Sequence, residues 1–592
     1  MGKKHKRQSA ETADRAARTA GSAGSKKTQE ASSGSGKRRA TTYDSFRENV
    51  EAIVTAIVLA VIIRHFAIEA FEIPTGSMAP SLYGIHAWTH CPNCRTKYNV
   101  ALRTDRQTNN AVQVDFRPTR VYEGQCGNSG CAKELHYFGT QAREVMCDGC
   151  DTRFAPPRGG TVREAAVKAF DARCPICTFG YRELIEDTNY YGGHKILVTK
   201  FSYVIDDPRR WDVIVFAFDQ WKNYIKRLVG LPGEMIDIWD GDIYVNGEIE
   251  RKYRHPYIQD ALWVKISDSD VAESQLRGHP LAWHERAPED SGRRDGAAKL
   301  VQWNEAAKSW SVNALGEVAV MEYTRGFDNF YSYNQVDRHG VSPHGAQVGD
   351  KKVELEIQAL PSRPHPTRRQ LGQPWVGAEI RDGDFTFQVR IPVGKPDPKR
   401  PAVLERMENH NREQPNPLRS EYRADPQRVT APIALPLNKA ARIAFENVDD
   451  RVAIYVRLDN QPIDEDDEPV LAIEYTSLPV GAELGRHLKM PAYDRGHSLD
   501  LVVVDSQVRL SHITVFRDMY YISEWDRLPR GSGRIASSRQ LGDNEYFALG
   551  DNGPSSSDSR FWGVVPHDNL MGKGFSVFWP ALPWNFQCKF IR

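Results

Sequence analysis

The sequence predicts a mostly β protein with one membrane helix near its start and two insertions within its β core. Short β-rich runs separated by turn residues recur from residue 188 onward, which is typical of antiparallel sheets. Eight of the nine cysteines fall between Cys91 and Cys177, which indicates one local metal or disulfide module. A single long apolar run, residues 52–63, precedes both features and indicates a membrane anchor.

Length and charge exclude some classes of protein. A chain of 592 residues suggests several domains, and 40% hydrophobic residues are enough to bury sizeable cores. The formal net charge of +1 argues against a protein that binds nucleic acid over its whole surface. We therefore expect no nucleic-acid partner.

The N-terminal part is predicted to place the chain in a membrane. Residues 1–42 are rich in Lys, Arg, Ser, Ala and Gly, so we expect a disordered basic tail. Residues 43–70 are predicted as one transmembrane helix, and a cleaved secretory signal is disfavoured because no A-x-A site follows. The basic side should stay cytoplasmic. We expect a single-pass protein of the cell membrane, with everything after the helix outside the cytoplasm.

The next segment, residues 71–84, is rich in turn residues and contains Thr75-Gly76-Ser77-Met78. Pro, Gly and Ser are ordinary turn residues, so a surface turn is one interpretation. A serine held on a tight corner beside a membrane is also a candidate nucleophile.

Residues 85–187 are predicted to be a zinc-ribbon insertion. Two cysteine-pair turns make one tetrahedral four-thiolate site, so eight thiolates suit two structural zinc ions. Adjacent knuckles are the simplest pairing, the first with the second and the third with the fourth. Four local disulfides in an oxidising compartment are the alternative. The knuckles are Cys91/Cys94, Cys126/Cys131, Cys147/Cys150 and Cys174/Cys177.

Residues 188–260 are predicted to form an antiparallel β segment in which Lys226 stands out. Lys226 interrupts a strand that is otherwise largely apolar, and alternation places it on the face of Tyr224 and Leu228. A buried lysine and an edge-strand gatekeeper are both compatible with this stretch.

Two further blocks complete the chain. Residues 261–525 hold many short strands and are predicted to be a β-sandwich insertion that resembles laminin-G or concanavalin-like jelly rolls. A scaffold without a ligand and a carbohydrate- or peptide-binding module both remain open for it. Residues 526–592 return to the core and contain the polar loop 550–560, where a calcium-like acidic loop is disfavoured because carboxylates are scarce.

Separated motifs together resemble the signature boxes of type I signal peptidases. Their order and the preceding anchor also match that family, whereas the two insertions lie outside the resemblance. The boxes are Ile73-Pro74-Thr75-Gly76-Ser77-Met78-Ala79-Pro80-Ser81-Leu82, Trp211-Asp212-Val213-Ile214-Val215-Phe216, Tyr224-Ile225-Lys226-Arg227-Leu228-Val229-Gly230-Leu231-Pro232-Gly233-Glu234 and Gly550-Asp551-Asn552 with Ser556-Ser557-Asp558-Ser559-Arg560.

The resemblance implies a membrane-bound serine endopeptidase with a serine–lysine dyad. Ser77 would be the nucleophile and Lys226 the general base, which requires a lysine pKa well below its usual value of about 10.4. Burial in an apolar strand acts in that direction. Thr75 would help to stabilise the oxyanion and Ser556 would orient the lysine. The supporting residues are Arg227, Asp551, Asn552, Asp558 and Arg560.

The resemblance also implies which partners the chain has. Signal peptides of secretory preproteins would be the substrates, the lipid bilayer and the secretion machinery would be partners, and catalysis would need no cofactor. A catalytically inactive, membrane-anchored scaffold that recruits partners through its zinc ribbons and sandwich is the alternative. A zinc-dependent hydrolase is disfavoured, because all candidate ligands are thiolates and no H-E-x-x-H motif is present.

Overall fold

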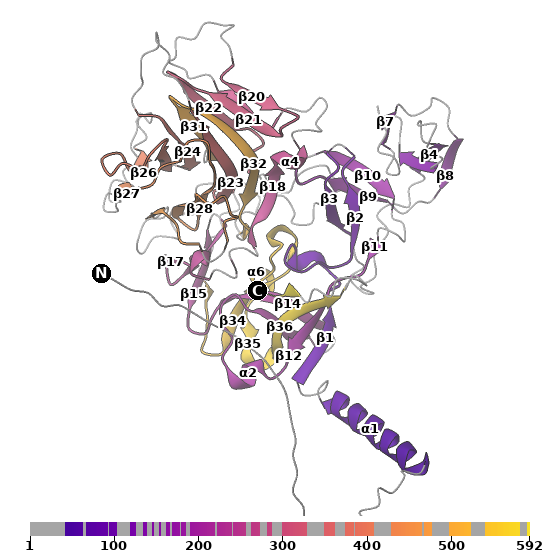
Figure 1. Cartoon of the computed structure of the whole chain (residues 1–592). Coiled ribbons are helices and arrows are strands. Elements are labelled where there is room, and N and C mark those ends of the chain that lie inside the picture. Colours follow the sequence, from indigo (N-terminus) through magenta and orange to yellow (C-terminus); the bar gives the residue numbers. More distant parts are fainter. Residues whose placement is uncertain are drawn as a thin grey trace, which may run out of the picture. The chain divides into compact units, whose positions relative to one another are not determined.

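Strands dominate the computed structural model of the chain (Figure 1), which confirms the mostly β class. The chain divides into two compact units, Met1–Ile62 and Ile63–Arg592. The structure describes residues 42–62, 67–102, short stretches between 119 and 184, 190–272, 281–286, 299–327, 348–361, 373–407, 428–475, 497–522, 539–579 and 589–591, with short gaps inside the longer ranges.

The first unit contains helix α1, Thr42–Ile62, whose first half carries charged residues and whose second half is apolar. Over the described residues, no helix combines the length and apolarity that a membrane crossing requires. The predicted helix over 43–70 is wrong at its C-terminal end, since Ile68–Glu72 forms strand β1. β1 pairs with a neighbouring strand, and Phe71 packs against a buried cluster, so the sheet outcompetes a longer helix there. The basic tail lies outside the described residues except for its last residue.

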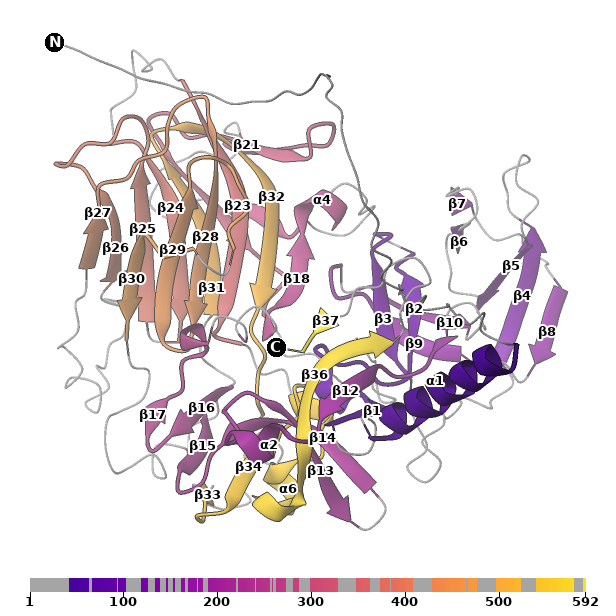
Figure 2. The same cartoon turned by 60° about the horizontal axis from the view of Figure 1, so that its bottom comes forward.

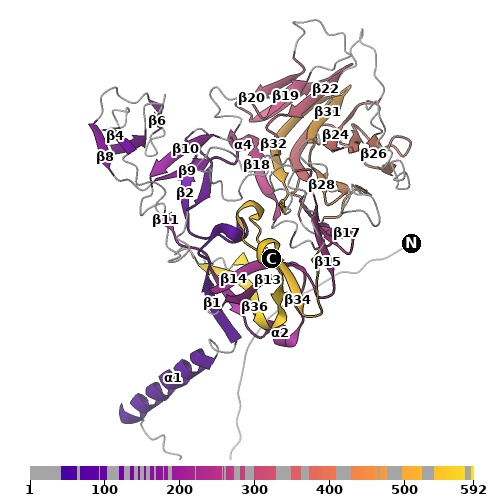
Figure 3. The ribbon, with the colours of Figure 1, turned by 180° about the vertical axis from the view of Figure 1, so that it is seen from behind.

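One eight-stranded antiparallel sheet joins all three segments that the sequence assigned to the core. Figure 3 shows β1, β13, β14, β34 and β36 gathered in this part of the second unit. In spatial order the strands are β1 (Ile68–Glu72), β12 (Lys195–Thr199), β36 (Leu570–Trp579), β13 (Val213–Asp219), β14 (Lys222–Gly230), β34 (Glu545–Leu549) and β35 (Val565–Pro566), with β37 (Lys589–Phe590) beside β36.

Alternation along β13 gives this sheet two apolar faces. Val213 and Val215 join the cluster that holds the nucleophile segment, whereas Ile214 and Phe216 join a cluster on the other side. A sheet buried on both faces holds its strands firmly, so side chains on β14 have fixed directions.

Smaller elements surround this sheet. A four-stranded sheet has the order β17 (Glu248–Ile249), β16 (Asp242–Val245), β15 (Met235–Trp239) and β33 (Arg539–Gln540). Among the described residues, the short helices of this part are α2 (Ser202–Ile205) and α6 (Ser559–Trp562), whereas α4 (Ser269–Ala272) lies against the second insertion. The 3-10 turns of the described residues are η2 (Gly76–Met78), η3 (Lys252–Arg254), η7 (Gly553–Ser555) and η8 (His567–Asn569).

The second insertion consists of two antiparallel sheets that share one apolar core. The first has the order β20 (Val301–Asn304), β21 (Ser309–Asn313), β32 (Gln507–Arg517), β23 (Lys351–Leu360), β28 (Ala440–Val448), β29 (Arg451–Arg457) and β30 (Leu471–Glu474), with β18 (Val264–Asp268) beside β32. The second has the order β19 (Trp283–Arg286), β22 (Val318–Tyr323), β31 (His497–Val504), β24 (Trp375–Asp382), β25 (Phe385–Pro392), β26 (Ala402–Met407) and β27 (Arg428–Ala431).

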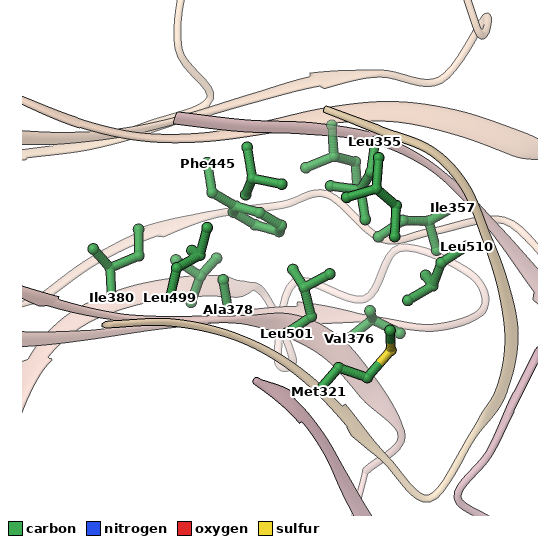
Figure 4. Packing of buried hydrophobic residues seen from close by; sticks show 14 of the residues in the cluster. Met321, Leu355, Ile357, Val376, Ala378, Ile380, Phe445, Leu499, Leu501 and Leu510 are labelled. Atoms are coloured by element: carbon green, nitrogen blue, oxygen red, sulfur yellow. The ribbon is translucent and has the colours of Figure 1, made fainter. Parts of the chain in front are cut away.

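Side chains from both of these sheets meet in the core of the insertion. Figure 2 shows the long strands of the two sheets alongside one another. In Figure 4, Leu355 and Phe445 of one sheet face Ala378 and Leu501 of the other, and all four belong to one buried cluster. The jelly-roll-like connectivity that the sequence suggested stays a prediction.

Where the second insertion meets the segment 188–260, a buried lysine lies among carboxylates. Lys252 of η3 is 2% exposed. Its Nζ pairs with Asp449 and lies 2.8 Å from Asp518 Oδ2 and 3.6 Å from Asp242 Oδ1. Asp350 completes this group of four buried carboxylates. Lys252 belongs to the segment 188–260 and two of its partners belong to the insertion, so the two parts share one ionic cluster.

The cysteine-rich insertion is built from hairpins. One three-stranded sheet has the order β11 (Tyr190–Tyr191), β2 (His86–His90) and β3 (Lys97–Ala101). The others are β9 (Ala169–Arg173) with β10 (Gly180–Leu184), β5 (Glu134–Phe138) with β4 (Thr119–Gln125) and β8 (Thr161–Ala165), and β6 (Val145–Met146) with β7 (Arg153–Phe154).

Candidate active site around Ser77

Ser77 lies in the short turn η2, directly after the segment that leaves strand β1. Met78 and Leu82 are buried in the apolar cluster beneath the sheet, and the Leu82 N–H donates to the Met78 carbonyl at 2.8 Å. Two buried side chains therefore fix the turn, while Ser77 itself remains half-buried. A fixed serine that still reaches the surface suits a group that must contact a substrate.

Lys226 extends from β14 to this serine. Its Nζ donates to Ser77 Oγ at 2.9 Å and to the Ile225 carbonyl at 2.9 Å, and the residue is 5% exposed. Burial lowers the pKa of Lys226 to about 8, although Asp558 and Asp551 act in the opposite direction. A sizeable fraction of this amine is therefore neutral near pH 8 and can accept a proton from a hydroxyl group.

The loop after β34 holds the Ser77 turn from the other side. The Asn552 N–H donates to the Ser77 carbonyl at 3.0 Å, and Asn552 Nδ2 donates to the Gly76 carbonyl at 3.1 Å. Gly550 lies against the same turn, since a Cβ there would be 2.4 Å from the Ser77 carbonyl oxygen and 2.2 Å from Ser556 Oγ. Only glycine fits this close approach of two backbones.

Arg227, the neighbour of the lysine, anchors this loop through a buried ion pair. Its Nε and Nη2 donate to the two carboxylate oxygens of Asp551, each at 2.7 Å, and both side chains are fully buried. Nη1 also donates to the Trp211 carbonyl at 3.0 Å, and Nη2 donates to Ser81 Oγ at 3.2 Å. One guanidinium therefore ties together β14, the nucleophile segment and the loop.

A second buried arginine fixes the far end of the loop. Arg560 donates from Nε and Nη2 to Asp558, at 2.7 and 2.6 Å, and Asp558 accepts the Gly550 N–H at 3.0 Å. Although burial acts to raise it, Arg560 and these hydrogen bonds hold the pKa of Asp558 below its usual value. Both carboxylates near Lys226 are thus already paired with an arginine.

The five predicted supporting residues lie around Ser77 and Lys226. Among the described residues, the contacts of Thr75 and Ser556 do not include those that their predicted roles require. Thr75 precedes η2 in extended conformation and is exposed, and its side chain makes no capping hydrogen bond. Ser556 is buried and lies against Gly550. Across the described part of the chain, neither hydrogen bond of the Lys226 amine goes to Ser556. The oxyanion role of Thr75 and the orienting role of Ser556 stay predictions.

The sequence did not single out several residues that support this site. Ser81 and the Trp211 carbonyl both bind Arg227, and Tyr521 donates to Asp551 Oδ1 at 3.5 Å. Ser81 and Trp211 lie inside the quoted boxes, so the boxes were the signal for them. Tyr521 lies near the end of the segment assigned to the second insertion, residues 261–525, where no spacing pointed to it.

The cysteines of the first and last knuckles converge on one point. Cys91, Cys94, Cys174 and Cys177 are buried, and their four sulfur atoms lie within 4.8 Å of one another. The predicted pairing of adjacent knuckles is therefore wrong for these four. The β9–β10 hairpin packs against β2 and β3 in one apolar cluster, which brings the outer knuckles together and leaves the middle of the insertion between them. The other four, Cys126, Cys131, Cys147 and Cys150, lie outside the described residues.

Comparison with protein families identifies similar proteins. Residues 186–308 and 519–579 match the family "Signal peptidase, peptidase S26". Signal peptidase I of Bacillus caldolyticus is 41% identical over 71 residues, which are 12% of this chain and 39% of the relative. Signal peptidase I V of Bacillus subtilis is 43% identical over 56 residues, 10% of this chain and 33% of the relative. Signal peptidase I of Haemophilus influenzae is 27% identical over 142 residues, 24% of this chain and 36% of the relative.

In these three comparisons the chain spans less than two fifths of each relative. Solved structures show only low similarity. The carbohydrate-binding module CBM66 of Bacillus subtilis has 12% identity and a TM-score of 0.21, over 40% of this chain and 94% of that one. The exoplasmic/lumenal domain of VIP36 has 7% identity and a TM-score of 0.25, over 43% of this chain and 92% of that one. At such scores these structures carry no argument about this chain.

Proposed function

We propose that this chain, a member of the signal peptidase S26 family over residues 186–308 and 519–579, cleaves signal peptides with Ser77 as nucleophile and Lys226 as general base. The observation that carries the proposal is the 2.9 Å contact between Lys226 Nζ and Ser77 Oγ within a buried site. The low pKa of Lys226 supports the same roles, because a general base works best when its pKa lies near the working pH.

The reaction follows from the positions of these groups. Neutral Lys226 accepts the Ser77 hydroxyl proton as Oγ attacks the scissile carbonyl carbon, which gives a tetrahedral oxyanion. The Ser77 N–H and the Thr75 hydroxyl are the proposed donors to that oxygen, and one such donor contributes about 3 kcal/mol. Protonated Lys226 then gives its proton to the leaving amine, which departs with the C-terminal product.

The second half of the reaction uses the same base. Water attacks the ester on Ser77, Lys226 accepts a proton from that water, and the proton returns to Ser77 Oγ when the peptide acid leaves. No step in this sequence uses a metal or an organic cofactor. Arg227 forms an ion pair with Asp551, and Arg560 forms one with Asp558, so these carboxylates do not hold Lys226 in its charged form.

We further propose that the substrate is presented at a membrane to which α1 anchors the chain, with the N-terminus cytoplasmic. The apolar half of α1 supports this, because Ile53, Ile57 and Val61 are more than half exposed. A reporter fused after residue 592 should be extracytoplasmic, and membrane fractions should retain the full chain but release a chain that begins at residue 67.

The dyad is tested with a secretory preprotein offered to membranes that carry the wild type, Ser77→Ala or Lys226→Ala. Each variant should lose cleavage by roughly a thousandfold or more. Lys222→Ala, an exposed lysine on the same strand, is the matched control and should cleave like the wild type. Equal cleavage by all four proteins would refute the dyad, and a wild type that binds preproteins without cleaving them would favour the scaffold alternative.

A further inference from the structure

We propose that Cys91, Cys94, Cys174 and Cys177 bind one Zn²⁺ ion, and that this metal site braces the turn that carries Ser77. The site lies away from the dyad and takes no part in the chemical steps. The bracing role rests on the function proposed above, whereas metal binding does not.

The spacing of the sulfur atoms fits a tetrahedral metal. Cys91 Sγ lies 3.4 Å from Cys177 Sγ, and Cys94 Sγ lies 3.5 Å from Cys174 Sγ. A tetrahedral zinc with bonds of about 2.3 Å places its sulfur ligands about 3.8 Å apart. Disulfide-bonded sulfur atoms would be about 2.05 Å apart, so neither of these two pairs is a disulfide.

The backbone around the first knuckle has the form of a metal-binding turn. The Cys94 N–H donates to Cys91 Sγ at 3.5 Å, and the Arg95 N–H donates to the Cys91 carbonyl at 2.8 Å. Arg95 has a φ of 61°, which closes the turn directly after the second cysteine. A backbone N–H directed at sulfur stabilises thiolate over thiol, as expected for a metal ligand.

Because the four cysteines are buried, they can be thiolates only if a cation lies beside them. The four cysteines form part of an apolar cluster with Val100 and Ala172, and each is no more than 4% exposed. Thiolates in such a cluster repel one another and are not solvated, unless a divalent cation compensates their charge. Four sulfur ligands favour zinc over the oxygen-seeking cations calcium and magnesium.

This site is joined to the Ser77 turn through β2. Cys91 directly follows β2, and β2 begins two residues after Gly84. Gly84 packs so closely on the backbone of Thr75 that a Cβ would lie 2.4 Å from the Thr75 carbonyl carbon. The Ile85 N–H also donates to the Pro74 carbonyl at 3.3 Å. A displacement of β2 is therefore transmitted to the residues directly before Ser77.

The chain that returns from the metal site contacts the same residues. β11 pairs with β2 and leads through Gly193 and His194 into β12. The His194 carbonyl accepts the Ile73 N–H at 2.9 Å, and a Cβ on Gly193 would lie 1.7 Å from the Ile73 carbonyl oxygen. Both connections of the cysteine-rich insertion therefore hold residues 73–75, and the metal would fix both connections at once.

Metal binding is tested on the full chain purified in detergent, by its zinc content and by the absorption of the cobalt-substituted protein. Cys174→Ser should contain one zinc per chain fewer than the wild type and lose the thiolate-to-cobalt charge-transfer band of this site. Cys174→His, which restores a zinc ligand, should recover the zinc. Cys588→Ser, a cysteine outside the four knuckles, is the control and should match the wild type.

The bracing role is tested by kinetics on the same samples. Removal of zinc with a chelator should lower kcat about tenfold with KM within twofold, and added Zn²⁺ should restore kcat. Unchanged zinc content in Cys174→Ser, iron in place of zinc, or disulfides among these four cysteines would overturn the metal site. Unchanged kcat after loss of that zinc would overturn the brace. A wild type without activity would refute the proposed function, and the zinc measurements would still decide the metal site.

Discussion

Lys226 and Lys252 are both buried, yet their surroundings favour opposite charge states. Lys226 contacts a hydroxyl and a backbone carbonyl, and burial lowers its pKa to about 8. Although burial also acts to lower the pKa of Lys252, Asp449, Asp518 and Asp242 raise that pKa well above its usual value. The decisive difference is the availability of nearby carboxylates. Around Lys226 an arginine pairs with each of them, whereas around Lys252 the lysine itself is the shared cation.

The comparison predicts a large loss of stability when the charged lysine is removed. Lys252→Met leaves buried carboxylates without their cation, so we expect a loss of about 3–5 kcal/mol. This loss of stability is measured as a lower urea midpoint of the unfolding transition, followed by tryptophan fluorescence. Lys265→Met, which removes a half-exposed lysine paired with Asp268, is the matched control and should cost less than about 0.5 kcal/mol. Equal midpoints for the two variants would mean that the ionic cluster does not stabilise the fold.

The neutral lysine predicts a pH dependence of cleavage. Because Lys226 must be neutral to accept a proton, kcat should approach a tenfold fall per pH unit below about 8, and so fall about fiftyfold between pH 8 and pH 6. The folded pKa lies below the unfolded value of about 10.4, so protonated Lys226 costs stability below pH 8, and this cost disappears as the pH rises to about 10.4. Cleavage rates are compared over the pH range in which circular dichroism shows an unchanged fold. A half-maximal rate at pH 6 or below would contradict the assignment of Lys226 as base.

The loop 550–560, in which Asp551 and Asp558 are paired with arginines, also sets the position of Ser77. Gly550→Ala would place a methyl group against the Ser77 carbonyl oxygen and Ser556 Oγ, so kcat should fall at least tenfold. In the control Gly180→Ala, the added Cβ meets only the Ala172 carbonyl oxygen, at 4.0 Å, and activity should not change. Cleavage by Gly550→Ala at the wild-type rate would show that the loop can move away from the turn without cost.

The smallest predicted effect concerns one hydrogen bond of the same loop. Asn552→Ala removes the side-chain bond to the Gly76 carbonyl and keeps the backbone bond to the Ser77 carbonyl. A single bond of this kind contributes about 1 kcal/mol, so kcat should fall about fivefold. Single-turnover rates relative to Lys222→Ala measure the change. A loss as large as that of Lys226→Ala would give Asn552 a chemical role.

Much of the site was predictable because its residues occur in short boxes with distinctive chemistry. Alternation within β14 placed Lys226 on the face of Tyr224 and Leu228 but left a buried lysine and an edge-strand gatekeeper open, and the structure shows Lys226 buried. The resemblance of the boxes to signal peptidases paired it with Ser77. Four of the supporting residues, Arg227, Asp551, Asp558 and Arg560, form two buried ion pairs whose partners the sequence did not specify. The antiparallel β segment predicted over residues 188–260 contains strands β11 to β17 in the structure.

Features that depend on distant contacts were not predictable. The pairing of Cys91 and Cys94 with Cys174 and Cys177 follows from hairpin packing and not from spacing along the chain. Strand β1 forms because β12 is available as a partner, although the sequence predicted that the membrane helix continues to residue 70. Lys252 has no local pattern that marks it, because its partners Asp449 and Asp518 lie on a different part of the chain.

The position of β36 in the eight-stranded sheet determines when that sheet can form during synthesis of the chain. β36 lies between β12 and β13, which come nearly four hundred residues earlier in the sequence, and it pairs with both. β12 also pairs with β1, and β13 with β14, but their other edges have no partner until the ribosome has synthesised residues 570–579. By then the loop that holds Ser77 has only just been made. Contacts so distant in sequence form late, because a long loop must close first. We therefore expect proteolytic competence to belong to the completed chain, so that unfinished copies cannot cleave neighbouring proteins.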